Sequence, residues 1–235
     1  MCGRFTLRVP AGVAAGYFSI FEVPPFVPRF NIAPTQPAPV VRLAPGQTAV
    51  AESPRELVWL RWGLIPGWAG DPAIGNRMIN ARAETAAEKP AYREAFRRRR
   101  CLVAADGFYE WPGGGKGKRK QPYFIHFIDD RPFAFAGLWE SWEGPDHSCV
   151  ESCTILTTGP NDLMRPIHDR MPVILDRDAS EQWLDPAIET PEPLAALLVP
   201  CPADEMVADP ISTWVNNSAH DDARCIEPER DLFSK

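Results

Sequence analysis

Proline is the residue that most limits how this chain folds. The 235 residues contain 26 prolines, spread along the whole length and not confined to one linker. Because proline lacks a backbone N–H and has a fixed φ, it ends or interrupts regular elements. We therefore expect short helices and short strands. Strands that do not alternate with long helices also argue against a parallel βαβ fold.

Apolar spacing and capping residues predict four short helices and a larger number of strands. The helices are expected at residues 11–22, 90–99, 178–184 and 193–199, the third capped by Asp178 or Ser180. The strands are expected at residues 57–62, 101–105, 122–128, 132–139, 153–158 and 171–175, with an exposed hairpin loop at 113–120. This pattern predicts a single α+β domain over residues 1–235, built on a curved, mainly antiparallel β-sheet, with a loose tail from about 226 to 235.

Composition places the chain among globular proteins, with 45% hydrophobic and 24% charged residues. The sequence has no apolar run long enough for a signal peptide or a membrane span. Its six cysteines include no C-x-x-C pair, so we expect reduced thiols. These features predict a soluble, cytoplasmic protein without a membrane partner.

Charge is divided unevenly along the chain. Residues 1–120 contain 18 Lys and Arg against 9 Asp and Glu, whereas residues 121–235 contain 7 against 22. The whole chain has a net charge of −6, which by itself argues against nucleic acid. The asymmetry indicates a basic face on an otherwise acidic protein, which is compatible with a polyanionic partner but also with a merely solvated surface.

Cys2 directly follows the initiator methionine. Aminopeptidase trimming favours a small second residue, so we expect Met1 to be removed and Cys2 to begin the mature chain. An α-amine has a pKa near 8, against about 10.4 for lysine, so more of it is unprotonated at neutral pH. Such an amine attacks an aldehyde to give an imine, and the neighbouring thiol can then close a five-membered thiazolidine. The alternative is that Cys2 is an inert buried thiol.

Three further polar clusters lie beside rigid aromatic or proline residues. In an extended segment Asn80 and Arg82 would share one face, and Glu110 lies between two aromatic residues, where a raised pKa would suit a general acid. His168 precedes an expected strand, two residues before Arg170. Each also has a structural interpretation: a surface carboxylate, a hydrogen-bonded structural histidine, or an ion-pair partner.

A metal site is not expected from the sequence. His147, Cys149 and Cys153 have a spacing that matches no common structural zinc pattern, and no fourth ligand is evident. The H-E-x-x-H and G-x-S-x-G motifs are absent from the sequence, which argues against metalloproteases and serine hydrolases.

Several segments, taken in order, resemble the SRAP family, the SOS-response-associated peptidase-like proteins that process abasic sites in DNA. They are "MCGRF" at the start, "RFNIAPTQ" at 29–36, "WGLIPGW" at 62–68, "NARAET" at 80–85, "RCLVAADGFYEW" at 100–111, "QPYFI" at 121–125, "FAGLWESW" at 135–142 and "IHDRMPVIL" at 167–175. The resemblance covers nearly the whole chain. It implies the family's fold, a barrel-like sheet core flanked by short helices.

The resemblance also implies an activity: covalent capture of the aldehyde of an abasic site in single-stranded DNA. Cys2 would form the thiazolidine, Asn80 would hold it in register, Glu110 would act as acid and base, and His168 would contact the sugar or phosphate. The residues implied in DNA binding are Arg4, Asn31, Pro34, Trp68, Arg82, Thr157 and Arg170. No cofactor or metal is implied, and weak lyase activity is expected as a side branch.

A protein that captures one lesion covalently is expected to act as a monomer and to associate with the nucleoid when bound to DNA. Because an abasic site has no base edge to read, binding is expected to be independent of sequence and to weaken with salt. Two segments depart from the family pattern: Gly159 and Pro160 stand where small residues such as alanine are expected, and residues 214–222 carry a histidine and two aspartates without an assigned role.

Two other functions remain open at this stage. Cys2 would also suit a peptidase in which the N-terminal thiol is the nucleophile and its own amine is the base. A plain single-strand binding module, in which Cys2 has no chemical role, is the second alternative.

Overall fold

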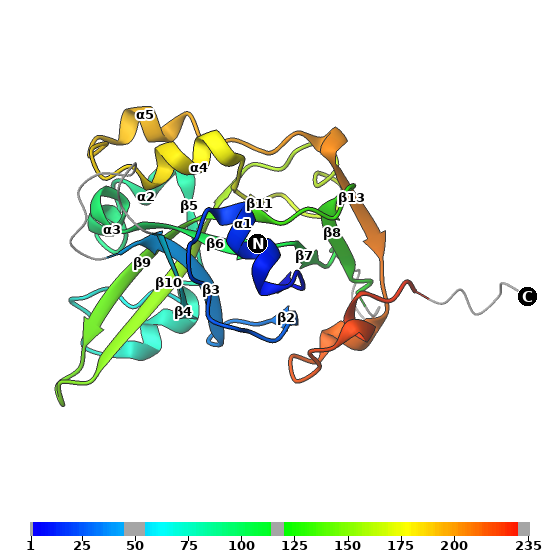
Figure 1. The fold of residues 1–235 in the computed structure, drawn as a ribbon, viewed down its shortest axis with the longest axis horizontal. Helices are drawn as coiled ribbons and strands as arrows, with labels where there is room; N and C mark the ends of the chain where they lie inside the picture. The colour runs from blue at the N-terminus through cyan, green and yellow to red at the C-terminus, as the bar shows by residue number, and fades with distance from the viewer. Residues whose placement is uncertain (1, 45–54, 114–119, 230–235) are drawn as a thin grey trace, which may run out of the picture.

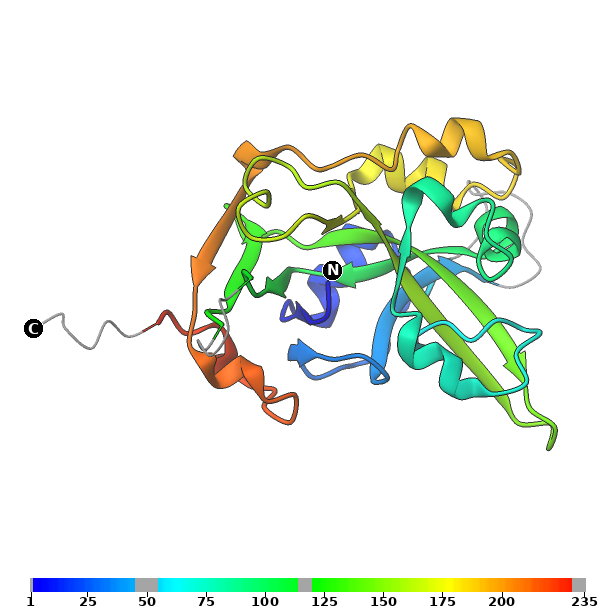
Figure 2. The ribbon, with the colours of Figure 1, turned by 180° about the vertical axis from the view of Figure 1, so that it is seen from behind.

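Two β-sheets, packed against each other, form the centre of the molecule (Figures 1 and 2). The computed structural model describes residues 2–44, 55–113 and 120–229. The smaller sheet is antiparallel and has the strand order β13-β8-β7-β1-β2. Its strands are β1 (Phe5–Leu7), β2 (Arg29–Ile32), β7 (Gly107–Glu110), β8 (Tyr123–Phe127) and β13 (Met206–Pro210).

The larger sheet has the order β11-β10-β4-β3-β6-β9-β12, with β5 alongside β10. Its strands are β3 (Pro37–Leu43), β4 (Arg55–Trp62), β5 (Asn80–Arg82), β6 (Arg100–Ala105), β9 (Phe133–Glu143), β10 (Cys149–Thr158), β11 (Met171–Pro172) and β12 (Ile174–Leu175). Most pairs are antiparallel, but β10 runs parallel to both β4 and β5. The structure thus confirms the predicted α+β class with a mainly antiparallel core.

Short helices cover the outside of the sheets (Figure 1). They are α1 (Ala11–Phe18), α2 (Ala83–Ala86), α3 (Arg93–Arg98), α4 (Arg177–Leu184) and α5 (Pro191–Ala195), with the 3-10 turns η1 (Pro72–Arg77), η2 (Ala203–Glu205), η3 (Thr213–Asn216) and η4 (Ala223–Ile226). Within the described residues, no helix is both long enough and apolar enough to cross a membrane.

Aromatic rings join the two sheets. Phe5, from the smaller sheet, meets Trp62 and Phe135 of the larger sheet edge-on, with ring centroids 5.1 and 5.8 Å apart. All three side chains are fully buried. Edge-to-face packing of buried rings is favourable beyond the apolar area that it removes from water. The first strand of the chain is therefore anchored in the core, only a few residues after Cys2.

The predicted helices all exist, with shifted ends. The helix expected at 11–22 ends at Phe18 because Ser19 adopts a left-handed conformation with φ of 55°. The helix expected at 178–184 begins at Arg177, and the predicted cap was wrong: the Asp176 carboxylate accepts the Ala179 N–H at 2.7 Å. The helices expected at 90–99 and 193–199 are α3 and α5.

All six predicted strands also exist, although the segment 171–175 is divided into β11 and β12. The strands that were not predicted are β1, β2, β3, β5, β7 and β13. The six cysteines all lie in the described residues and are free thiols. The hairpin loop expected at 113–120 falls on residues of which 114–119 lie outside the described ones.

The loose tail expected from about residue 226 overlaps residues that the structure places in the fold. Ile226 is the last residue of η4, and Pro228 forms a β-bridge with Ile211. Residues 226–229 are therefore part of the fold, and residues 230–235 lie outside the described ones.

Candidate active site

Cys2 is fully buried at the entrance to β1. That strand lies between β2 and β7, with Phe5 paired to both Ile32 and Phe108. The Cys2 thiol lies 3.6 Å from the Arg4 carbonyl oxygen, to which it donates. Burial raises the pKa of the Cys2 thiol strongly, and the charge of Glu110 raises it further. At neutral pH the sulfur is therefore a protonated thiol.

Asn80 fixes the backbone of Cys2 from the other sheet. Its side-chain Nδ2 donates to the Cys2 carbonyl oxygen at 2.7 Å. Asn80 is the first residue of β5, where it pairs with Ile155 of the long strand β10. Its Oδ1 is buried and accepts no hydrogen bond from the described part of the chain. A buried amide oxygen without a donor is unfavourable, so this atom is available to a ligand that brings an N–H or O–H.

Glu110 ends β7, next to the N-terminal segment. The preceding residue, Tyr109, donates its backbone N–H to the Arg4 carbonyl at 3.0 Å, so β7 and the start of the chain run side by side. The Glu110 side chain is 4% exposed. Burial raises its pKa to about 7, and the nearby charge of Asp169 also raises it. Near neutral pH, Glu110 can therefore both donate and accept a proton.

His168 lies beside this group, in the loop between β10 and β11. Its Nδ1 is 3.0 Å from the Arg170 backbone nitrogen and 2.8 Å from an Asp169 carboxylate oxygen. The first contact requires Nδ1 to be an acceptor, whereas the second requires a proton on Nδ1, in either the neutral or the charged ring. Burial lowers the pKa of His168. The neutral ring, with Nδ1 accepting from Arg170 and the proton on Nε2, is therefore the favoured form at neutral pH.

Arg170 and Thr157 lie together on the β10 side of the site. The Arg170 guanidinium binds both oxygens of Glu84, at 2.5 and 2.9 Å, and donates to the Thr157 carbonyl. Thr157 is buried and pairs in register with Arg82 across β10 and β5, and the Arg82 side chain is exposed. The two arginines therefore differ: Arg82 faces solvent, and Arg170 is held by a carboxylate.

Arg4 and Asn31 form a second pair. Arg4 donates to the Asn31 side-chain oxygen at 3.0 Å and to the Val215 carbonyl at 3.1 Å. Asn31 is fully buried, and its Nδ2 lies within 3.2 Å of the carbonyl oxygens of Val215, Asn217 and His220. Sequence reasoning gave the segment around residue 220 no role, and here it supplies most of the partners of this pair.

Pro34 and Trp68 are carried by turns. Pro34 lies between β2 and β3, and Trp68 lies in the loop between β4 and η1 with 65% of its surface exposed.

Gly159 directly follows β10, and a Cβ there would meet no atom within 4 Å. The glycine is therefore not required by packing, and alanine would fit equally well.

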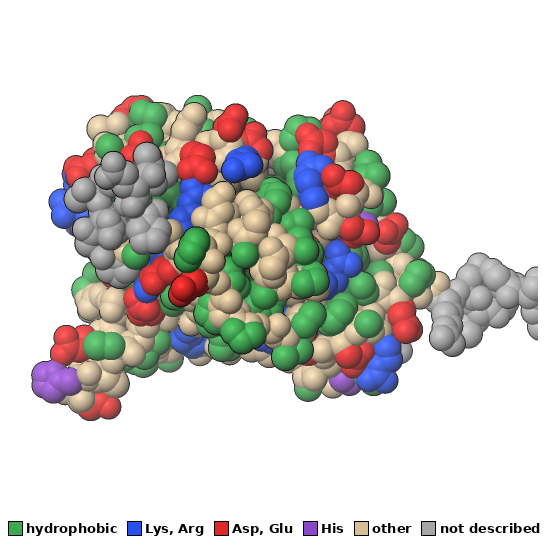
Figure 3. Space-filling model, viewed as in Figure 1, with side chains coloured by type: hydrophobic (Ala, Val, Ile, Leu, Met, Phe, Trp, Pro, Cys, Tyr) green, Lys and Arg blue, Asp and Glu red, His purple; other side chains and the backbone are tan. Residues whose placement is uncertain are grey.

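The charge asymmetry of the sequence does not give a continuous basic surface on the face seen in Figure 3. On the described part of the face in Figure 3, basic and acidic side chains are interspersed. Ion pairs between the two halves of the chain explain this: Arg29 pairs with Asp221, Arg42 with Glu151 and Arg55 with Glu181. In the described segments, no group of three or more His, Cys, Asp or Glu side chains is arranged to hold a metal ion.

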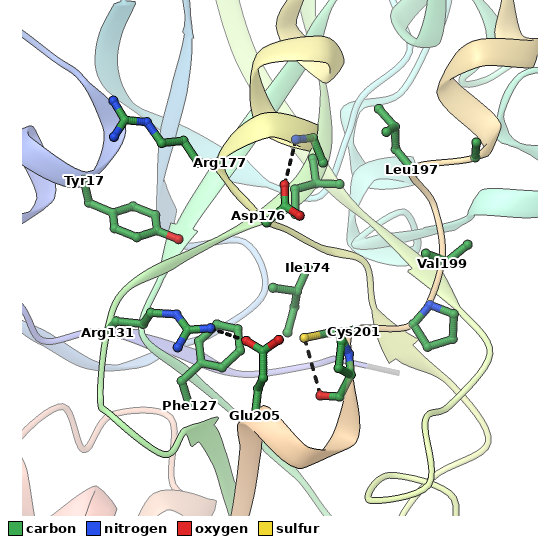
Figure 4. Close-up of a pocket in the computed structure, with 15 residues that line it drawn as sticks. Tyr17, Phe127, Arg131, Ile174, Asp176, Arg177, Leu197, Val199, Cys201 and Glu205 are labelled. Carbon is green, nitrogen blue, oxygen red and sulfur yellow. Dashed lines mark hydrogen bonds and ion pairs between the residues drawn. The ribbon is translucent and has the colours of Figure 1, made fainter.

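A cavity of about 440 Å³ lies between α1, α4 and the segment before η2 (Figure 4). Tyr17, Arg177 and Cys201 are among its lining residues, and none of the candidate site residues is. Its rim charges are largely internal to the fold, because Arg131 pairs with Glu205 and Asp176 caps α4. The cavity is therefore separate from the group around Cys2.

The fold and the site define a class of protein: a two-sheet α+β domain with an amide, a carboxylate and an imidazole gathered near a cysteine at the start of the chain. The family model described as SOS response associated peptidase (SRAP) matches residues 1–218. The chain belongs to the SRAP family, as the sequence motifs predicted.

Named relatives agree with this assignment. The abasic site processing protein YoaM of Bacillus subtilis is 42% identical over 235 residues, which cover 99% of this chain and 100% of the relative. The abasic site processing protein HMCES of Xenopus tropicalis is 36% identical, over 86% of this chain and 66% of the relative. A crystal structure of a protein from Bacteroides thetaiotaomicron has a TM-score of 0.81 at 27% identity, covering 97% of this chain and 100% of that one.

Proposed function

We propose that this protein processes abasic sites in single-stranded DNA by forming a covalent thiazolidine link between Cys2 and the ring-opened sugar. The observation that carries the proposal is the Asn80–Cys2 hydrogen bond of 2.7 Å, which fixes the second residue of the chain in the group that contains Glu110. The relatives named as abasic site processing proteins support the substrate class.

The chemistry requires that Met1 is removed, so that Cys2 carries a free α-amine. The amine adds to the sugar aldehyde, and loss of one water gives an imine. The thiol sulfur then bonds to the imine carbon while its proton is transferred to the nitrogen, which closes the ring. Because burial keeps the Cys2 thiol protonated, the amine is the first nucleophile and the thiol acts second.

Glu110 is suited to the proton transfers. With a pKa of about 7, its protonated form would assist opening of the sugar and loss of water, and its carboxylate would accept the thiol proton during ring closure. His168, as a neutral ring, would donate a hydrogen bond from Nε2 to the sugar or phosphate. The imine intermediate also permits β-elimination, so we propose weak lyase activity as a side branch.

DNA binding would use cationic and stacking groups around this centre. Arg82, which is exposed, and Arg170, held close by Glu84, are suited to phosphates, with Arg4 on the other side. Trp68 and the Pro34 turn would pack against flanking bases. Thr157 and Asn31 are buried, so we propose that they act by holding Arg170 and Arg4. The protein would act as a monomer, and no cofactor is needed for the condensation.

One intact-mass measurement tests the proposal. Protein mixed with an abasic single-stranded oligonucleotide should show the loss of Met1 and a mass increase equal to one oligonucleotide minus one water. Cys2→Ser should keep DNA affinity but lose the heat-stable adduct, because an oxazolidine hydrolyses easily. An equally stable adduct from Cys2→Ser would contradict the thiazolidine mechanism.

The same reagents separate the alternatives. Turnover of peptide substrates that is unaffected by abasic DNA would favour a peptidase with Cys2 as nucleophile. Equal affinity for intact and abasic strands, without any mass increase, would favour a simple binding module.

A further inference from the structure

The C-terminal segment from Trp214 to Asp221 packs against the Arg4 side of the site. This segment, which we call the clamp, supplies the carbonyl oxygens of Val215, Asn217 and His220 to the Asn31 amide. Val215 also accepts from Arg4 at 3.1 Å. In Figure 1 the clamp lies at the lower right, next to β2. Arg4 and Asn31 are therefore held by residues about 200 positions away in the sequence.

Asp221 joins the clamp to β2. One carboxylate oxygen accepts the backbone N–H of Phe30 at 2.6 Å and of Asn31 at 2.9 Å, and the other pairs with Arg29. β2 is the last strand of the smaller sheet. Edge strands expose backbone groups that need a partner, and here one carboxylate takes the place of a further strand. It thereby fixes the backbone from which the Asn31 side chain reaches Arg4.

Aromatic stacking makes the clamp rigid. The Trp214 and His220 rings are parallel within 11°, with centroids 3.5 Å apart, and the Arg224 guanidinium lies 4.1 Å from the Trp214 ring. The His220 Nδ1 is also 2.8 Å from the Trp214 carbonyl oxygen. The loop that presents the three carbonyls is thus closed on itself. Asp221 follows this stacked pair directly and lies beyond residues 1–218, which the family model matches.

We propose that Asp221 is a positioning residue for DNA binding, which acts through Asn31 to aim the Arg4 guanidinium at a phosphate of the lesion strand. This inference rests on the proposed function. Without the carboxylate, the β2 backbone and the clamp lose their shared anchor, and Arg4 loses the fixed oxygens that orient it. Asp221 touches neither the lesion nor the reacting atoms.

The direction in which DNA affinity changes when the Asp221 charge is removed distinguishes a positioning role from a long-range electrostatic one. Removing a negative charge near a DNA site strengthens binding when only the long-range field matters. Loss of a positioning carboxylate weakens it, because a phosphate contact is lost. Asp209 offers a matched control: it is an exposed aspartate of β13 in the same sheet, and its carboxylate pairs with His126, away from β2 and the clamp.

The experiment measures the affinity of a fluorescent single-stranded oligonucleotide with one abasic site, in a Cys2→Ser background that forms no stable adduct. We expect Asp221→Asn to weaken DNA binding about tenfold, because that is the effect of losing one hydrogen bond to a charged group. The slope of log affinity against log salt should fall by about 0.7, the value for one phosphate on a single strand. Asp209→Asn should leave affinity unchanged or slightly higher.

A double-mutant cycle with Arg4→Lys tests whether Asp221 acts through Arg4. In the Arg4→Lys background, Asp221→Asn should have little further effect. The same tenfold loss in both backgrounds, or no loss in either, would overturn the proposal. Should Asp221→Asn fail to fold by thermal melting, Asn31→Ala takes its place in the cycle and is judged by the same outcomes. A parent protein without measurable DNA affinity would instead overturn the proposed function.

Discussion

At the scale of single residues, burial decides the chemistry around Cys2. The thiol and the Glu110 carboxyl both lie in an apolar environment that disfavours their charged forms. The thiol is thereby kept protonated, whereas Glu110 is brought to a pKa of about 7. In the proposed mechanism, the same physical cause would prevent early attack by sulfur and provide an acid and base that works near neutral pH.

Glu110→Gln should slow adduct formation without much change in strand binding, and it should also change the pH profile. In the wild type, the protonated acid is lost as pH rises through about 7, while the free amine is gained as pH rises toward about 8. The single-turnover rate should therefore pass through a maximum between these values, and the variant should lose the falling limb at high pH. Identical pH–rate profiles would remove Glu110 from the mechanism.

Glu110 should also affect the pH dependence of stability. Its pKa is about 7 in the folded protein against an ordinary 4.5, so the folded state holds the proton more tightly. The unfolded state releases its proton first, and stability conferred by the neutral carboxyl falls as pH rises from about 4.5 to 7. Urea unfolding at several pH values should show this decrease in the wild type, and Glu110→Gln should reduce it. A variant with the same decrease as wild type would contradict the assignment.

Asn80→Ala tests the role of the amide that holds Cys2. Loss of the 2.7 Å hydrogen bond to the Cys2 carbonyl should leave the N-terminus less well oriented and slow adduct formation about tenfold to a hundredfold. DNA affinity, measured in the Cys2→Ser background, should change little. A loss in affinity equal to the loss in rate would mean that Asn80 acts by binding DNA.

At the scale of elements, the position of β1 and β7 depends on a glycine. A Cβ on Gly107 would overlap the Phe124 ring of β8 and lie 3.0 Å from the Thr6 hydroxyl. Gly107→Ala should therefore lower the free energy of unfolding by about 1–3 kcal/mol. Gly16→Ala in α1, where a Cβ meets no atom within 4 Å, should instead be neutral or stabilising by up to about 1 kcal/mol. Thermal or urea unfolding of both variants checks the difference, and equal effects would contradict it.

Strands were missed from the sequence for two physical reasons. β3 reads "PAPVVRL", and proline normally argues against a central strand. In the structure β3 pairs with β6 only from Val40 onward, so Pro37 and Pro39 face a partner on one side alone. β1, β5 and β7 are three or four residues long, which is too short to show periodicity. Longer strands with alternating or continuous apolar residues, such as β9 and β10, were predictable.

The site was predictable only in part, because some of its residues are held by partners from distant segments of the chain. Cys2, Asn80 and Glu110 stand in short motifs whose chemistry can be recognised, and the structure brings them together. The partners that hold the arginines come from distant segments: Glu84 for Arg170, and the carbonyls of the clamp for Arg4. Such pairings depend on tertiary contacts, and nothing in the local sequence around Glu84 or Asp221 indicates them.

At the scale of the whole molecule, ion pairs between the two halves of the chain occupy several arginines, among them Arg29, Arg42 and Arg55. The two arginines Arg82 and Arg131 should therefore differ in their contribution to DNA binding. Arg82 is exposed, whereas Arg131 is already paired with Asp129 and Glu205 beside the separate cavity. Arg82→Ala should weaken single-strand binding and lower the salt slope by about 0.7, as for one lost phosphate contact. Arg131→Ala is the matched control and should leave the slope unchanged. Equal slopes for wild type and Arg82→Ala would show that Arg82 does not touch phosphate, whereas a reduced slope for Arg131→Ala would mean that DNA extends to the far side of the fold.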